Sequence, residues 1–385
     1  LWAQDQQAIT LGKKDKLYSE ILEEEREVWI YLPASFSPEA KYPVIYLLDG
    51  DIYFHSLAGM LQQLSSYGNT SCPEAILVGI PNVDRGRDLT PSDPQDGDQP
   101  QTAHRNFIQF LEKELIPYVE KKYKALPHRS LFGHSLGGTF VIQILLEKPD
   151  LFRNYLSMDP GLKFYEYRFR DQALRKLQQG KYPDQSLYVT VANTMPEGMD
   201  TLTALQDSTW VTSTIRTNLN FAKTLETYTG NQLDYQWRYF PDDNHLNVPH
   251  PSHYRALKYF FRWHPLDLDK TLRTNPDIRG AEFYQIITEH YQKVSQELNY
   301  LVLPPEIQVS DLGEYFYGLG DYEGAKKLYQ LNLKNYPQNS DHAAALGDLF
   351  METKEKEKAL EFYQKAYKLD GNAYAKKKIE ALQKN

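Results

Sequence analysis

The sequence predicts an α/β fold with a mostly parallel sheet, followed by an all-helical segment. Over the first 268 residues, eight apolar runs with strand character alternate with helical patterns, and several are continuous enough for a sheet covered on both faces. The last part of the chain instead repeats itself every 34 residues. When Gly replaces Tyr in the count, roughly 39% of residues are apolar, against ~45–50% in most globular chains. This deficit also favours a polar helical array.

The predicted strands are spaced along the chain as short runs bounded by turn residues. They cover 17–22, 27–32, 44–48, 75–80, 129–133, 154–158, 187–192 and 235–240. The first two are amphipathic and follow each other closely, so they predict a hairpin at an antiparallel edge of the sheet. Helical patterns are clearest at 102–122 and 136–147, with others at 52–66 and 211–228.

The 34-residue period brings equivalent residues into register. Leu312-Gly313 recurs as Leu346-Gly347, and Tyr329 recurs as Tyr363. This pattern resembles the tetratricopeptide repeat (TPR), in which small residues let two helices approach and aromatic residues fill the seam. We expect an α/β domain at 1–268, a linker with an adaptor helix at 269–306, and TPR-like repeats at 307–385. The resemblance implies a protein partner or self-association, and the alternative is that the repeats only support the fold.

Composition excludes several classes of partner. The chain has 385 residues, with 43 basic and 51 acidic side chains. This acidic balance disfavours nucleic acid as a partner, and no apolar run approaches the ~18 residues of a membrane span. The single Cys72 excludes an internal disulfide, and we expect no metal and no cofactor. If the start, Leu1-Trp2-Ala3-Gln4, is the remnant of a signal peptide, the protein is periplasmic or secreted, and otherwise it is cytoplasmic.

The strongest motif is a nucleophile elbow. Gly133-His134-Ser135-Leu136-Gly137 has the form G-x-S-x-G, with an apolar strand before it and an apolar helix after it. Such a turn projects the serine hydroxyl over the edge of the sheet. Ser135 is therefore the expected nucleophile, and the backbone N–H of Leu136, at a helix start, is an expected oxyanion donor.

A serine nucleophile needs a base and an acid that orients the base. His245 follows the last predicted strand, where a hydrolase fold carries its base; His250 and His253 are the competitors. The acid is expected after the strand 187–192. Glu197 is the first choice, Asp200 is the alternative, and a Ser–His dyad also remains open.

Other residues are expected near the nucleophile because they follow strands of the same sheet. In Asp49-Gly50-Asp51, the N–H of Asp51 is the second expected oxyanion donor. Arg85 and Arg87 are expected either to bind an anionic group of the substrate or to pair internally with Asp84 or Asp88. Tyr53, Phe54 and Trp210 are candidate aromatic walls for the substrate, with a core role as the alternative.

Five ordered motifs together resemble one family. They are the elbow, the loop at 47–50, the segment 84–91, the helical stretch FIQFLEKELIPYVEKKY and the terminal segment NHLNVPHPSHYRAL. Over about residues 10–265 the chain resembles the esterase D and enterochelin (siderophore) esterase-like branch of the α/β-hydrolases. In the terminal motif, Asn247 stands where relatives carry a serine.

The resemblance implies hydrolysis of a small-molecule ester, of a siderophore, acyl or aryl type, through an acyl-enzyme on Ser135. A serine acyltransferase or peptidase with the same triad is one alternative. The other is a partner-binding scaffold with an inert hydrolase domain.

Overall fold

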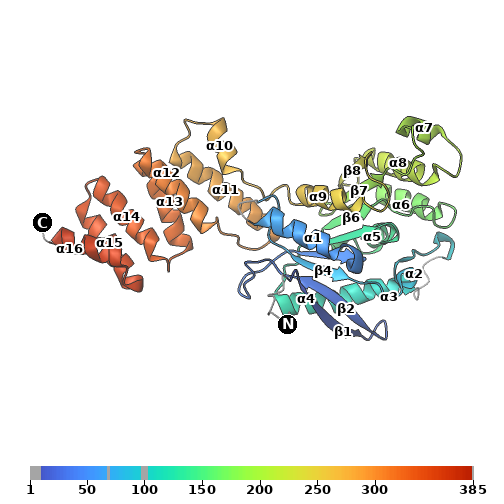
Figure 1. The fold of residues 1–385 in the computed structure, drawn as a ribbon, viewed down its shortest axis with the longest axis horizontal. Helices are drawn as coiled ribbons and strands as arrows, with labels where there is room; N and C mark the ends of the chain where they lie inside the picture. Colours follow the sequence, from blue (N-terminus) through green and yellow to red (C-terminus); the bar gives the residue numbers. More distant parts are fainter. Residues whose placement is uncertain (1–9, 67–69, 97–102, 384–385) are drawn as a thin grey trace, which may run out of the picture. The chain divides into compact units, whose positions relative to one another are not determined.

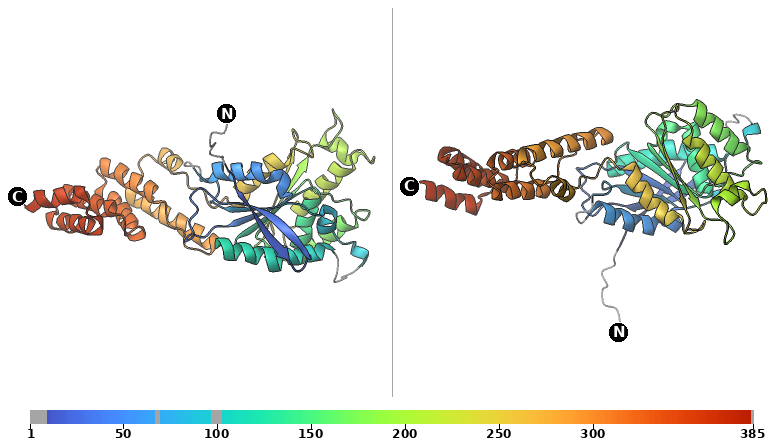
Figure 2. Two further views of the ribbon diagram at one scale, coloured as in Figure 1. Left: turned by 60° about the horizontal axis from the view of Figure 1, so that its bottom comes forward. Right: turned by 90° about the horizontal axis from the view of Figure 1, so that it is seen from above.

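The computed structural model describes residues 10–66, 70–96 and 103–383. The chain divides into two compact units, Leu1–Pro265 and Leu266–Asn385. Figures 1 and 2 show a central sheet flanked by helices in the first unit and helices alone in the second. Residues 1–4, on which the expectation of export depends, lie outside the described residues.

The sheet has eight strands in the order β1-β2-β4-β3-β5-β6-β7-β8. β1 pairs antiparallel with β2 and β2 with β4, whereas every pairing from β4 through β8 is parallel. This confirms the mostly parallel sheet with an antiparallel start. The strands are β1 (Lys13–Ser19), β2 (Glu24–Tyr31), β3 (Val44–Leu48), β4 (Ile76–Ile80), β5 (Arg129–His134), β6 (Asn154–Met158), β7 (Ser186–Ala192) and β8 (Asp234–Phe240).

The first strand lies earlier than predicted. The apolar pattern at 17–22 extends past the true end of β1, because Glu20, Ile21 and Leu22 belong to the hairpin turn. In that turn, the Glu114 carboxylate accepts hydrogen bonds from the backbone N–H groups of Glu20 and Ile21, at 3.0 and 3.2 Å. A distant carboxylate thus satisfies turn donors that local sequence would assign to a strand.

Helices cover both faces of the sheet. One face packs against α1 (Gly50–Ser65) and α9 (Pro249–Phe260), and the strands present Ile45, Leu47 and Phe132 to it. The other face packs against the remaining large helices of the unit: α3 (Ala103–Phe110), a π-helical turn (Leu111–Leu115), α4 (Ile116–Tyr123), α5 (Leu136–Glu147), α6 (Arg168–Gln179) and α8 (Ser213–Glu226). Residues alternate between the two cores, as a strand period of two requires.

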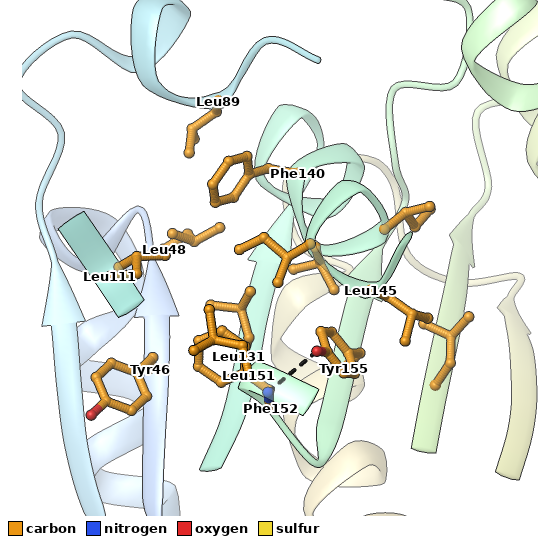
Figure 3. Packing of buried hydrophobic residues seen from close by; sticks show 14 of the residues in the cluster. Tyr46, Leu48, Leu89, Leu111, Leu131, Phe140, Leu145, Leu151, Phe152 and Tyr155 are labelled. Carbon is orange, nitrogen blue, oxygen red and sulfur yellow. Dashed lines mark hydrogen bonds between the residues drawn. The ribbon is translucent and has the colours of Figure 1, made fainter. Parts of the chain in front are cut away.

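The larger core lies beneath α5, where Phe140 and Leu145 meet Leu131 and Tyr155 of the sheet (Figure 3). All of β3, β6 and β7 is buried, so these strands are held in register by apolar contacts on both faces. The short helices α2 (Arg85–Leu89) and α7 (Thr201–Gln206) follow β4 and β7 and lie at the carboxyl end of the sheet (Figure 1). This rigid sheet fixes the positions of the loops that leave its carboxyl edge.

The second unit consists of helices around one apolar core. They are α10 (Leu268–Thr274), α11 (Gly280–Leu298), α12 (Glu306–Gly318), α13 (Tyr322–Asn335), α14 (Ser340–Glu352), α15 (Lys356–Asp370) and α16 (Ala373–Gln383). The predicted adaptor helix is α11, which packs against α12 and α13 of the same unit.

Two helix pairs of the second unit share one packing device. A Cβ placed on Gly313 would collide with the ring of Tyr329, and a Cβ on Gly347 would lie 2.6 Å from Cδ1 of Tyr363. Each pair therefore depends on a glycine in its first helix that faces a tyrosine in its second. The predicted 34-residue period thus corresponds to a repeated contact between helices.

Among the described residues, none of the helices combines the length and the apolar character that crossing a bilayer requires.

Candidate active site

The elbow has the strained backbone that its motif predicts. Ser135 lies between β5 and α5 with φ 57° and ψ −116°, a conformation that non-glycine residues rarely adopt. Its N–H donates to the carbonyl of Met158 (2.9 Å), and its own carbonyl accepts from the N–H groups of Thr139 (3.0 Å) and Gly161 (3.2 Å). Gly133 is needed because a Cβ there would lie 2.5 Å from the carbonyl carbon of Gly137. The surrounding backbone thus holds the serine in its strained position.

The structure brings Ser135 and His245 together. His245 Nε2 lies 3.1 Å from Ser135 Oγ, which is hydrogen-bond distance. Its other ring nitrogen, Nδ1, lies 2.6 Å from Oδ2 of Asp159. The His245 side chain is 37% exposed, whereas that of Asp159 is 1% exposed. The three side chains therefore form a continuous hydrogen-bonded chain that ends in a buried carboxylate.

The predicted acid is corrected by this geometry. Asp159 follows β6, not β7, and its second oxygen, Oδ1, accepts from the N–H of Ala192 (3.2 Å) and from Nδ2 of Asn218 (2.9 Å). Asp200 instead caps α7 by accepting from the N–H of Thr203, and Glu197 is exposed in the loop before it. Neither Glu197 nor Asp200 is among the partners of His245.

Sequence reasoning missed Asp159, although one signal was present. Asp159 stands directly after the buried strand β6, in Met158-Asp159-Pro160-Gly161. The signal is this charged residue at the end of an apolar strand, where the core does not need one. Its backbone has φ 38°, and its N–H donates to the carbonyl of Thr190 in β7. Asp159 could therefore be identified as an aspartate at a strand end, a residue type that tolerates a left-handed backbone.

The competing histidines lie elsewhere. His250 is exposed in the first turn of α9. His253, in the same helix, is completely buried, and its ring stacks on Phe132 with centroids 5.9 Å apart. The choice of His245 over His250 and His253 therefore agrees with the geometry.

The start of α1 differs in detail from the expected oxyanion loop. The left-handed residue is Asp49 (φ 54°), not Gly50. Gly50 is required for a different reason, because a Cβ on it would lie 2.5 Å from the backbone nitrogen of Ile80 in β4. Asp51 then falls in the first turn of α1, and Leu136 in the first turn of α5, where backbone N–H groups lack intrahelical acceptors.

Both predicted arginines are engaged by carboxylates of the protein. Arg85 binds Asp49 through Nε (2.6 Å) and a terminal nitrogen (3.0 Å), and that terminal nitrogen also donates to the carbonyl of His134 (3.1 Å). The hydrogen bond to Asp49 raises the pKa of Arg85. Arg87 binds Asp88 and makes two hydrogen bonds to Glu24. The internal-pair alternative therefore holds for Arg87 with Asp88, and for Arg85 with an acid that the sequence did not indicate.

The aromatic candidates separate into three roles. The hydroxyl of Tyr53 lies 3.0 Å from Nδ1 of His134, and the His134 ring packs 4.5 Å from that of His245. Phe54 is buried in the core of α1, where it meets Trp29. Trp210 is 84% exposed in the segment between α7 and α8. Tyr53 thus contacts His134, whose ring packs against that of His245; Phe54 is a core residue, and Trp210 alone of the three is exposed enough to meet a large ligand.

Three buried histidines are held neutral. Burial, together with the neighbouring His245, lowers the pKa of His134 to about 4. Burial likewise lowers the pKa of His128 to about 4 and that of His253 to about 3. His128 packs between Phe261 and Trp263, at centroid distances of 5.7 and 5.9 Å. His134, whose ring adjoins that of His245, therefore adds little positive charge to the candidate site at neutral pH.

Within the described part of the chain, His, Cys, Asp and Glu nowhere form a group of three that could hold a metal ion. The arrangement that remains is a hydroxyl, an imidazole and a carboxylate at the carboxyl edge of a parallel sheet. That set of groups can activate a hydroxyl for attack on a carbonyl carbon.

Comparison with known proteins agrees with this geometry. The family described as "Putative esterase" matches residues 19–242, which include Ser135 and Asp159. Ferri-bacillibactin esterase BesA from Bacillus subtilis is 34% identical over 153 residues, covering 35% of this chain and 53% of that protein.

Two solved structures are similar over larger parts of the chain. An IroE-like serine hydrolase from Shewanella oneidensis has a TM-score of 0.66 at 27% identity, covering 84% of this chain and 99% of that one. An uncharacterised protein from Capnocytophaga ochracea shares the fold, with a TM-score of 0.71 at 18% identity, over 97% of this chain and all of that one. The chain spans about half the length of the Bacillus esterase that it matches.

Proposed function

The chain belongs to the "Putative esterase" family, and from this membership we propose that it is a serine ester hydrolase acting on a small molecule. The observation that carries the proposal is the hydrogen-bonded chain from Ser135 through His245 to Asp159 on a strained elbow. Each member has the partner that its role requires, and the carboxylate is buried, so it orients the imidazole in a single direction.

The proposed reaction begins with attack by Ser135 Oγ on the ester carbonyl carbon, while His245 Nε2 accepts the hydroxyl proton. Asp159 stabilises the resulting imidazolium through Nδ1. The tetrahedral intermediate then collapses, its carbon–oxygen bond to the alcohol breaks, and His245 returns the proton to the leaving alcohol. Water, deprotonated by His245, then attacks the acyl carbon; the bond from that carbon to Ser135 Oγ breaks, the acid leaves, and His245 returns the proton to Oγ.

The backbone N–H groups of Leu136 and Asp51 are the proposed oxyanion donors. Both belong to first helical turns, where the helix dipole favours negative charge. A Cβ on Gly137 would lie 3.2 Å from Oδ2 of Asp49, so the starts of α5 and α1 adjoin. Arg85 supports this arrangement, because it bonds both Asp49 and the carbonyl that precedes Ser135.

The experiment that tests the proposal combines covalent labelling with turnover. A fluorophosphonate probe should label the wild-type chain and leave Ser135→Ala unlabelled, and p-nitrophenyl acetate, butyrate and octanoate should report hydrolysis. His245→Ala should abolish turnover while His250→Ala retains it. If the wild-type chain shows neither labelling nor turnover, the scaffold alternative with an inert hydrolase domain replaces this proposal.

Two classes of ester are candidates for the substrate. The name of the Bacillus relative supports a siderophore-type ester, and the exposed apolar side chains beside the site support a simple acyl or aryl ester. Acyl transfer to another acceptor, or peptide cleavage, would use the same triad. Mass spectrometry of the products with added alcohols or amines separates hydrolysis from transfer.

For the second unit we propose TPR-like partner binding. Its helix pairs repeat at 34 residues, and a groove of about 480 Å³ is lined by Glu314, Asp348, Glu352, Lys378 and several tyrosines. Three carboxylates against one lysine favour a basic peptide segment. A fluorescent lysine-rich peptide should bind the full chain, and Glu314→Gln with Glu352→Gln should weaken it. A glutamate-rich peptide that binds equally well would contradict the proposal.

A further inference from the structure

We infer that the active site proposed above selects esters that carry no negative charge, whether uncharged or cationic, and discriminates against anionic esters. Of the two ester classes named above, it therefore favours a simple acyl or aryl ester over an anionic siderophore-type ester. The inference rests on Ser135 being the nucleophile. It is carried by the charges in the loops that leave the carboxyl edge of the sheet and by the internal pairing of their cations.

The carboxyl edge holds a large excess of acids. The segments that follow β3, β4, β6, β7 and β8 are 49–51, 81–95, 159–168, 193–212 and 241–248, and together they contain twelve acidic and four basic side chains. The formal net charge of this set equals that of the entire chain, −8. Because all these segments meet at one edge, their fields add around the nucleophile.

The arginines of this edge are neutralised by the protein itself. Arg85 is bound to Asp49, and Arg87 to Asp88 and Glu24, as described above. Arg168 binds Asp93 through Nε (3.1 Å) and a terminal nitrogen (2.6 Å). A substrate carboxylate or catecholate would therefore have to compete with an existing carboxylate for each guanidinium.

The fourth cation, Lys163, is exposed and donates to the hydroxyls of Ser213 (3.2 Å) and Thr214 (3.0 Å). Lys163 is already counted among the four basic side chains, so the net charge of the edge remains negative. Several acids of the edge are exposed instead, including Asp51, Asp84 and Asp242. They are the charges that an approaching substrate meets first.

Exposed apolar side chains lie in the same loops as these acids and His245. Ile52, Val83 and Leu246 are 62%, 58% and 77% exposed, and they neighbour Asp51, Asp84 and His245 in the chain. Exposed aliphatic side chains of this kind favour contact with an uncharged acyl or aryl group. The same acidic surroundings attract a cationic group and repel an anionic one.

The test compares three p-nitrophenyl esters of similar size on the full chain. These are the butyrate, the 4-(trimethylammonio)butyrate and the hemisuccinate, each normalised by its hydroxide-catalysed rate. At about 10 mM ionic strength, where the Debye length is ~30 Å, kcat/KM should be at least as high for the cationic ester as for the neutral one. The anionic ester should be at least about tenfold slower, and salt near 0.5 M should narrow the gap.

A charge-matched pair of variants localises the effect. Asp84→Asn with Asp242→Asn removes two exposed charges at the carboxyl edge, and Asn retains the helix cap that Asp84 provides. Glu39→Gln with Asp184→Asn removes two exposed charges that precede β3 and β7, at the opposite edge. The first pair should raise kcat/KM for the hemisuccinate about fourfold. In water, removing one negative charge at ~10 Å from the substrate carboxylate changes the rate roughly twofold, and two charges are removed. The second pair should leave it unchanged.

The outcomes separate the two proposals. Equal normalised rates for the anionic and neutral esters at low salt, or equal effects of the two variant pairs, would overturn the inference and leave the esterase proposal intact. Absence of turnover on all three esters, together with absence of fluorophosphonate labelling, would instead refute the esterase proposal itself.

Discussion

Replacing Asp159 by Asn tests the most specific feature of the site. The Oδ1 atom of Asp159 accepts from the N–H of Ala192 and from Nδ2 of Asn218. An asparagine at this position must keep its oxygen toward those two donors, so its NH2 group faces Nδ1 of His245. Nδ1 must then accept a hydrogen bond, and the ring proton moves to Nε2. In that tautomer His245 cannot accept the proton of Ser135.

The expected magnitude follows from the short contact that is lost. Opposite unit charges at the 2.6 Å separation of His245 Nδ1 and Asp159 Oδ2 interact by about 6 kcal/mol at an effective dielectric constant of 20. The imidazolium forms only on the way to the transition state, so this loss falls on the activation barrier. About 6 kcal/mol corresponds to roughly 10⁴-fold in rate at 1.36 kcal/mol per tenfold. We therefore expect kcat of Asp159→Asn to fall by about 10³–10⁴.

The assay is p-nitrophenyl butyrate hydrolysis by the full chain, with thermal unfolding as a check that the variant folds. Glu197→Gln and Asp200→Asn are the matched controls, and both should retain kcat within about twofold, since neither residue is a partner of His245 and Asn also caps a helix. A fall of less than tenfold in Asp159→Asn, with a large loss in either control, would refute the reasoning and restore the acid to the loop after β7.

The other predictions concern packing and protonation. Gly50→Ala should destabilise the fold by several kcal/mol and lower turnover, because its Cβ would collide with the β4 backbone. Gly59→Ala, in the same helix with open space around it, should stabilise by up to about 1 kcal/mol, and urea unfolding measures both. Between pH 6.5 and about 4, unfolded histidine binds a proton that buried His128 does not, so stability should fall as pH falls through this window. His128→Phe should remove up to about 3 kcal/mol of this pH dependence of stability, which a plot of Tm against pH measures. If the slope of that plot were the same in the variant as in the wild type, the assignment to His128 would be wrong. In the second unit, Gly313→Ala should destabilise and Gly318→Ala should not, as followed by limited proteolysis; equal effects would argue against the glycine–tyrosine contact.

Local sequence was sufficient for the features that depend on neighbouring residues. The elbow needs a strand, glycines that permit a close approach, and a helix within one short segment, and all of these are readable around Ser135. His245 could be chosen because it follows the last strand. The glycine–tyrosine contacts of the second unit were visible as a period, since each repeat packs mainly on itself and its neighbours.

The acid could not be chosen from local sequence, because five strand ends offer a carboxylate at the same edge. Which of them meets His245 depends on how the loop after β8 crosses the sheet, and that is a tertiary property. Gly50 shows a similar limit. Its neighbours suggested a turn, but the constraint comes from the backbone of β4, about thirty residues away in the chain.

The position of the acid bears on how the site can recognise its substrate. β6 lies directly beside β5 in the sheet, so Ser135 and Asp159 follow adjacent strands, and the loop after β8 must reach across the end of β7 to bring His245 between them. That crossing is held by Asn193, whose N–H and side-chain amide donate to the carbonyls of Asp243 (2.7 Å) and Pro241 (2.9 Å). The segment after Asn193 therefore carries none of the three hydrogen-bonded groups. Within it, Asp200 caps α7 and Asp207 accepts from Thr212 before α8, whereas Glu197 and Trp210 are exposed and can differ with the substrate without a change to the contacts among Ser135, His245 and Asp159.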